Sequence, residues 1–121
     1  MAWNKVHTVT LTTISAGTCT AYTDDVINAN VLAVVFAKGT LDTPTITVTG
    51  DKSGISIITK VSMASGTYYP RGTAVAPGLT DLTYDGTYKV PVLIPLANEK
   101  IKVVVSAGGS VLAGSIKFIT G

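Results

Sequence analysis

Apolar and polar side chains alternate with a period of two through several short segments of this 121-residue chain. The clearest examples are residues 101–106 and 115–120, in which isoleucine, valine and phenylalanine alternate with lysine, serine and threonine. This period predicts strands with one buried face. Between them, residues 107–110 read Ala-Gly-Gly-Ser and tolerate positive φ angles. The pattern therefore predicts that the two strands form a hairpin.

Three earlier segments also have strand patterns. Residues 5–14 alternate apolar residues with threonine and predict a strand or an extended arm. Residues 31–37 are apolar on both faces, which predicts a central strand covered on each side. Residues 45–49 and 55–59 flank a loop with glycine at both ends, Gly50–Gly54, which predicts a second hairpin.

Residues 60–89 differ from the rest because glycine and proline interrupt them repeatedly and four of the five tyrosines lie there. We expect a long excursion with one short strand near residues 82–84, since an unstructured loop of this length is unusual inside a compact domain. Residues 90–96 contain two prolines, which predicts an edge strand or an irregular one.

Valine, isoleucine and threonine dominate the chain, and these β-branched residues favour pleated sheets. No stretch of ten or more residues has a helical period. The sequence predicts an all-β fold, an antiparallel β-sandwich or jelly-roll-like single domain with an extended N-terminal arm. Residues 1–25 are assigned to the arm or a strand, and residues 26–121 to the sandwich domain.

The composition adds an expectation about partners. Hydrophobic residues make up 46% of the chain and charged residues only 13%, about half the share usual in soluble domains. The longest apolar run, residues 31–37, is far too short to cross a bilayer, so no membrane role is predicted. Much apolar surface with few charges favours a second burial step, in an oligomer or on a partner surface.

Charge and cysteine content exclude further classes. The net charge is +2, and the nine basic residues are scattered, whereas nucleic-acid-binding proteins concentrate them on one face. No nucleic-acid partner is therefore expected. Cys19 is the only cysteine, so neither an internal disulfide nor a zinc site built on cysteine pairs is possible. A single thiol fits synthesis in a reducing cytoplasm.

The sequence contains no recognisable catalytic pattern. Every carboxylate except Glu99 lies in a turn-like context, and His7, the only histidine, has no evident catalytic or zinc-binding partners. Gly50–Gly54 lacks the spacing of a phosphate-binding loop. We therefore expect no enzyme activity, no catalytic residues, no metal site and no cofactor.

Contacts with a partner are expected instead from a few aromatic and basic side chains. Trp3 is either an exposed terminal residue or an anchor on a neighbouring subunit, because tryptophan is favoured at interface hot spots. Tyr68, Tyr69 and Arg71 form a contact patch or cap one end of the core, and we favour the contact patch. His7 is interpreted as a surface or interface side chain.

From Val26 onward the arrangement of these segments resembles that of the small head-decoration (cement) proteins of tailed bacteriophages. A hydrophobic strand at residues 31–36 leads to a Thr-Pro-containing strand and an Asp-containing hairpin turn within residues 43–58. A variable stretch, a Pro-flanked strand and a final hairpin with Ala-Gly-Gly and Gly-Ser-Ile-Lys-Phe-Ile follow. The resemblance lies in the arrangement, not in a signature motif, and residues 60–89 depart from it.

The resemblance implies a structural virion protein that is made in the host bacterial cytoplasm and decorates the capsid exterior. Its partner would be the major capsid protein, and a homo-oligomer, with a trimer favoured, is expected. An N-terminal arm would contribute to attachment, so that deleting residues 1–14 would weaken binding and leave the sandwich folded. The alternatives are another virion part (a head fibre base, a tail-tube or an adaptor subunit) and a carbohydrate- or host-binding β-sandwich module.

Overall fold

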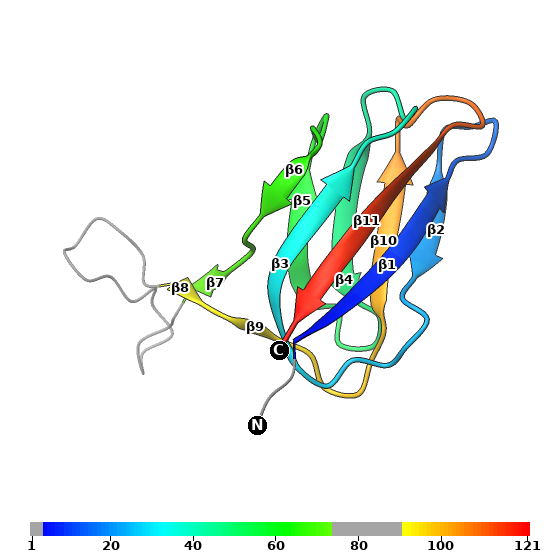
Figure 1. The fold of residues 1–121 in the computed structure, drawn as a ribbon. Helices are drawn as coiled ribbons and strands as arrows, with labels where there is room; N and C mark the ends of the chain where they lie inside the picture. Colours follow the sequence, from blue (N-terminus) through cyan, green and yellow to red (C-terminus); the bar gives the residue numbers. More distant parts are fainter. Residues whose placement is uncertain (1–3, 74–90) are drawn as a thin grey trace.

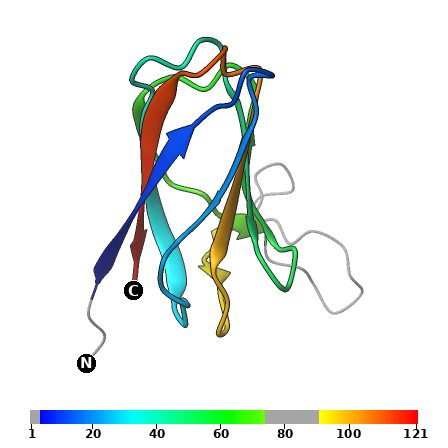
Figure 2. The ribbon, with the colours of Figure 1, turned by 90° about the vertical axis from the view of Figure 1, so that its right-hand side faces the viewer.

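The structure is a computed structural model that describes residues 4–73 and 91–121. Its strands form two antiparallel sheets that pack face to face, as the two views in Figures 1 and 2 show. The described residues contain no helix, and accordingly none that is long and apolar enough to span a membrane. The predicted all-β sandwich is confirmed, whereas the jelly-roll variant stays a prediction.

The first sheet, sheet A, has the strand order β1-β11-β3-β6, and β9 pairs with β3 beyond the end of β6. Its strands are β1 (Lys5–Thr12), β3 (Asn30–Ala37), β6 (Gly66–Tyr68), β9 (Ile94–Pro95) and β11 (Ala113–Thr120). Sheet B has the order β2-β10-β4-β5, formed by β2 (Cys19–Tyr22), β4 (Thr45–Gly50), β5 (Ser56–Lys60) and β10 (Ile101–Ser106). A small separate ribbon pairs β7 (Gly72–Thr73) with β8 (Pro91–Val92).

The core lies between the two sheets and consists of alternate residues of the long strands. This is the physical result of the period of two, because successive side chains of a strand point to opposite faces. The residues that are inaccessible to solvent include Leu11, Val31, Val34, Ile46, Val48, Ile101, Val103, Val105, Ile116 and Phe118. Threonine occupies most of the outward positions of β1 and β4.

Residues 5–12 are an integral strand of sheet A and not a free arm. All eight residues of β1 pair with β11, from Lys5 opposite Thr120 to Thr12 opposite Ala113. Residues 19–22 likewise form β2, which pairs with β10 in sheet B. Residues 1–25 were expected to form either an arm or a strand, and these two segments form strands. The extended arm is wrong for them because their apolar side chains complete the core.

The predicted C-terminal hairpin is wrong, although both of its strands are correct. β10 pairs with β2 and β4 in sheet B, whereas β11 pairs with β1 and β3 in sheet A. Residues 107–112 therefore form an arch that crosses from one sheet to the other. Hydrogen bonds to other loops hold this arch, since Gly108 N–H donates to Gly17 O (3.0 Å) and Asp42 N–H donates to Gly108 O (2.9 Å).

The expected double coverage of residues 31–37 holds on one face only. β3 lies between β11 and the short strands β6 and β9, and Val34 and Phe36 are buried against sheet B. On the outer face the coverage is only partial, since Ala33 is buried but Val35 is half-buried, and the sandwich formed by the described residues has two layers. The all-apolar pattern thus marks a central position within a sheet, not a central layer.

The hairpin between β4 and β5 is confirmed. The two strands pair directly, and Gly54 N–H donates to Gly50 O across the loop (3.0 Å). Within the excursion, residues 60–73 contain two short strands, β6 and β7, which the sequence did not indicate. The strand expected near residues 82–84 lies outside the described residues. The proline-containing segment is irregular, as expected, since it consists of the two-residue strands β8 and β9.

Replacing Val111 is expected to stabilise the fold. This residue has a φ of 51° and is 67% exposed, at the end of the arch. A β-branched side chain in the left-handed region costs about 1 kcal/mol or more, whereas asparagine tolerates it. We expect Val111→Asn to raise the free energy of unfolding by about 1 kcal/mol in urea denaturation. Val61→Asn is the control, because Val61 is equally exposed but has no positive φ, and an equal gain there would contradict the strain argument.

Candidate functional site

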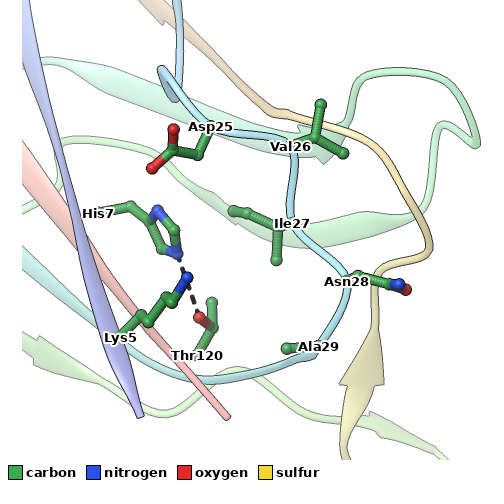
Figure 3. A pocket seen from close by; sticks show the side chains of 8 residues that line it. All are labelled: Lys5, His7, Asp25, Val26, Ile27, Asn28, Ala29 and Thr120. Carbon is green, nitrogen blue, oxygen red and sulfur yellow. Dashed lines mark hydrogen bonds between the residues drawn. The ribbon is translucent and has the colours of Figure 1, made fainter. Parts of the chain in front are cut away.

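A hollow among the described residues lies where β1 and the β2–β3 loop leave the side of the sandwich open. It has a volume of about 230 Å³. Its lining, drawn in Figure 3, comes from the start of β1, the loop and the end of β11: Lys5, His7, Asp25, Val26, Ile27, Asn28, Ala29 and Thr120. Five of these eight side chains are polar, so the hollow offers hydrogen-bonding groups close to an exposed sheet edge.

His7 is the central polar residue of this opening. It occupies an inward-facing position of β1 opposite Phe118 and is half-buried. Its Nε2 lies 3.2 Å from Thr120 Oγ1, and the two atoms share a hydrogen bond. In Figure 3 the Asp25 carboxylate points into the hollow from the opposite wall. The bond to Thr120 fixes the ring and leaves its other nitrogen on the side of the loop.

A second hollow of similar volume adjoins the first and shares two of its residues, His7 and Asp25. It is completed by Val6, Thr8 and Asp24. Together the two hollows form a groove along the first half of β1, residues 5–8. Its charged side chains are of mixed sign, with Lys5 on the strand and Asp24 and Asp25 on the loop. Among the described residues, no three histidine, cysteine or acidic side chains are grouped closely enough to hold a metal ion.

The loop wall of the groove is fixed to sheet B by specific hydrogen bonds. The hydroxyl of buried Thr23 donates to Asp25 O (3.0 Å) and accepts from Ile101 N–H (3.1 Å). Ile27 N–H donates to Glu99 O (2.8 Å). Asp24 and Asp25 thus lie in a bend that is held by the Thr23 hydroxyl, which bonds the backbone two residues further on, and not by their own carboxylates.

Three of the predicted contact residues lie at the other edge of sheet A. Tyr68 pairs opposite Val34, faces the core, and donates its hydroxyl to Ala64 O (2.6 Å). Its ring therefore belongs to the core, as in the capping alternative. Tyr69 is 69% exposed. Since β1 and β6 are the two ends of the strand order, the structure does not bring His7 together with these residues. Trp3 lies outside the described residues.

Arg71 fixes the segment that presents Tyr69. Its Nη1 donates to Leu32 O on β3 (2.9 Å) and to Pro70 O (2.7 Å). Pro70 is buried, and half-buried Tyr68 precedes the exposed ring. An exposed aromatic side chain is thus held between two anchored neighbours, which lowers the entropy lost when a partner covers it. Arg71 contributes to any contact here as a positioning residue as well as a charge.

Sequence reasoning missed the role of Glu99. Its side chain is buried, and Oε1 accepts hydrogen bonds from Lys52 N–H (3.0 Å), Ser53 N–H (3.0 Å) and Ser53 Oγ–H (3.1 Å). The bond from Ser53 N–H is the largest cause that lowers the pKa of the carboxyl below its ordinary value; burial opposes it. A signal was present, because Glu99 is the only carboxylate outside a turn-like context.

Comparisons with known proteins assign no family, so this protein can be classified only by its fold. No family model matches the chain, and neither the curated proteins nor the solved structures contain a match. The chain is thus an antiparallel two-sheet β-sandwich with two separate surface features, the groove beside β1 and the Tyr69 segment beside β6.

Proposed function

We propose that this chain is a structural virion protein, a capsid decoration protein that binds the major capsid protein on the outside of a tailed-phage head and stabilises it. The observation that carries the proposal is the rigid presentation of Tyr69. An aromatic ring that is 69% exposed, on a segment fixed by a buried proline and by the Arg71 bonds to the backbone, is typical of an interface anchor.

The physical properties of the chain favour attachment to a repeating surface. Each copy of a decoration protein meets the same lattice site, so modest contacts are repeated many times over the shell. The described outer faces of both sheets carry mostly threonine, serine and small apolar side chains, with few charges. Contacts made by such surfaces depend little on salt.

The location is tested on tailed-phage particles released by cells that carry this gene. Antibody raised against the folded protein is expected to label the heads of intact particles in immunogold electron microscopy. Labelling confined to the tail or the neck would favour the alternative of a tail-tube or adaptor subunit, and particles without label would contradict a virion role altogether.

The attachment surface is tested by replacing the exposed tyrosine. We expect Tyr69→Ala to weaken binding to heads that lack the protein by at least tenfold, because truncation of an interface hot spot costs about 2 kcal/mol or more. Tyr22→Ala is the matched control, since Tyr22 is also exposed but lies on the outer face of sheet B. Co-sedimentation with the heads measures both variants, and equal binding by Tyr69→Ala and the wild type would refute this surface.

A further inference from the structure

We infer that β1 is a self-pairing edge, and that two copies of this chain join by antiparallel pairing of their β1 strands. On one side, all eight residues of β1 pair with β11. On the other side, none of the strands within residues 4–73 and 91–121 pairs with β1. The strand therefore presents a row of backbone donors and acceptors, which is the template for strand addition.

The hydrogen bonds at the end of β1 show which residues point outward. Thr13 N–H donates to Leu112 O (2.8 Å), so the backbone of Thr13 faces β11. On β11, Ala113 O and Gly121 N–H bond toward the β3 side, to Thr40 and Asn30. Because bonding directions alternate in an antiparallel ladder and this one has no register shift, the odd residues of β1 face β11.

The outward set follows directly. The backbone N–H and C=O groups of the even residues face away from the sheet, and these residues are Val6, Thr8, Thr10 and Thr12. All four are exposed.

The other sheet edges carry the protection that β1 lacks. β6 and β9 have only three and two residues, and β9 contains a proline. In sheet B, β2 has four residues, and the β5 edge has a register shift and ends on Lys60. By contrast, β1 has eight residues without a bulge or a proline, and its only lysine is at its first position. Long, regular edges of this kind pair with other strands unless they are blocked.

The outward residues favour a second copy as the partner. In an antiparallel pair related by a two-fold axis, the residue numbers of any two opposed residues add up to the same total. All four outward residues are opposed to one another only when this total is 18. Thr8 then lies opposite Thr10 of the second copy, and Val6 lies opposite Thr12 of the second copy. Cross-strand threonine pairs stabilise such a ladder.

Charge permits the same register. Lys5 would lie opposite Thr13 of the second copy, and His7 opposite Leu11, so no like charges are opposed. Val6, which is 61% exposed in the single chain, would gain a neighbouring strand. The pairing joins the two A sheets into one continuous sheet around a two-fold axis, whereas the resemblance favoured a trimer. This inference is independent of the capsid role, because it concerns the protein alone in solution.

The register is tested by disulfide formation between two single-cysteine variants. Thr8→Cys and Thr10→Cys are prepared in a Cys19→Ala background, mixed in equal amounts and oxidised mildly. Paired residues of neighbouring strands have Cα atoms about 5.5 Å apart, within disulfide range. We expect at least fivefold more covalent dimer from the mixture than from either variant alone. Thr59→Cys, on the β5 edge, is the control and should give little.

The association itself is tested by sedimentation velocity at micromolar concentrations of the full chain. We expect a wild-type dimer, and we expect Thr10→Pro to raise its dissociation constant at least tenfold. Proline at position 10 removes an N–H group that points away from β11, so no internal hydrogen bond is lost, and an unchanged circular dichroism spectrum would verify the fold. A monodisperse wild-type monomer would overturn the inference, and so would equal crosslinking in all mixtures. Either result would also be obtained if β1 accepts a strand of another protein and not a second copy, and that case too counts against the inference.

Discussion

A chain that lacks residues 1–14 is expected to remain unfolded at 25 °C. The deletion removes the whole of β1 and with it two core side chains, Val9 and Leu11, which are 4% and 0% exposed. Burial of each contributes about 1.5–3 kcal/mol, and the ladder with β11 is lost as well. Domains of this size are stable by only about 5–15 kcal/mol. The earlier expectation that this deletion leaves the sandwich folded is therefore replaced.

The prediction is checked by circular dichroism and by the dispersion of amide resonances in a two-dimensional NMR spectrum. Two point variants calibrate it. Leu11→Ala should lower the free energy of unfolding by about 2–5 kcal/mol, as for other fully buried leucines. Thr10→Ala, one position away and exposed, should change it by no more than about 0.5 kcal/mol. A deletion variant with native-like dispersion would show that β1 is an accessory strand.

Glu99→Ala is expected to lower the free energy of unfolding by about 3 kcal/mol. Its Oε1 accepts three hydrogen bonds from Lys52 and Ser53. Without the acceptor, the Lys52 and Ser53 N–H groups and the Ser53 hydroxyl each lose a hydrogen bond to a charged group. Because Lys52 and Ser53 are exposed and water can replace the acceptor, each lost bond costs about 1 kcal/mol. Gly50 packs against the same carboxylate so closely that a Cβ there would overlap Oε1, so the truncation also removes a packing contact of the loop. Urea denaturation at pH 7 measures the loss.

Glu99→Gln separates the charge from the shape of this side chain and gives the pH dependence. Because the pKa of Glu99 is lowered in the folded protein, its ionised form stabilises the fold above the unfolded pKa of about 4.3. That contribution is lost as the pH falls through the lower folded value. We expect the wild type to exceed Glu99→Gln by about 1–2 kcal/mol at pH 7 and the difference to shrink below about pH 4. A difference independent of pH would exclude the carboxylate charge as the cause.

The sequence predicted the strands better than their partners. Alternation at residues 101–106 and 115–120 identified β10 and β11, because the period of two is a local property. Their assignment to different sheets depends on hydrogen bonds between Gly108 and distant loops, which no local pattern records. Likewise, the pattern of residues 31–37 reported burial within a sheet but not the number of layers.

The candidate site was predicted only in part. The ring of Tyr69 is exposed, and its contact role stays a prediction, while Tyr68 packs against the core as in the capping alternative. His7 lies in a groove whose other wall, the loop with Asp24 and Asp25, is distant in sequence and was interpreted only as a turn. The free backbone edge of β1 has no residue signature, since it arises from where the strand falls in the order of sheet A.

Pairing between β1 and β11 also determines when this fold can be completed. Lys5 and Thr120 are opposed in the same ladder, so β1 cannot pair with β11 on the ribosome until β11, about a hundred residues further along the chain, has been synthesised. Loop closure over such a distance slows folding compared with local hairpins. During that interval the threonine-rich strand and its apolar residues are exposed, and misassembly between nascent chains competes with folding. Slow refolding is therefore the kinetic behaviour expected of this topology.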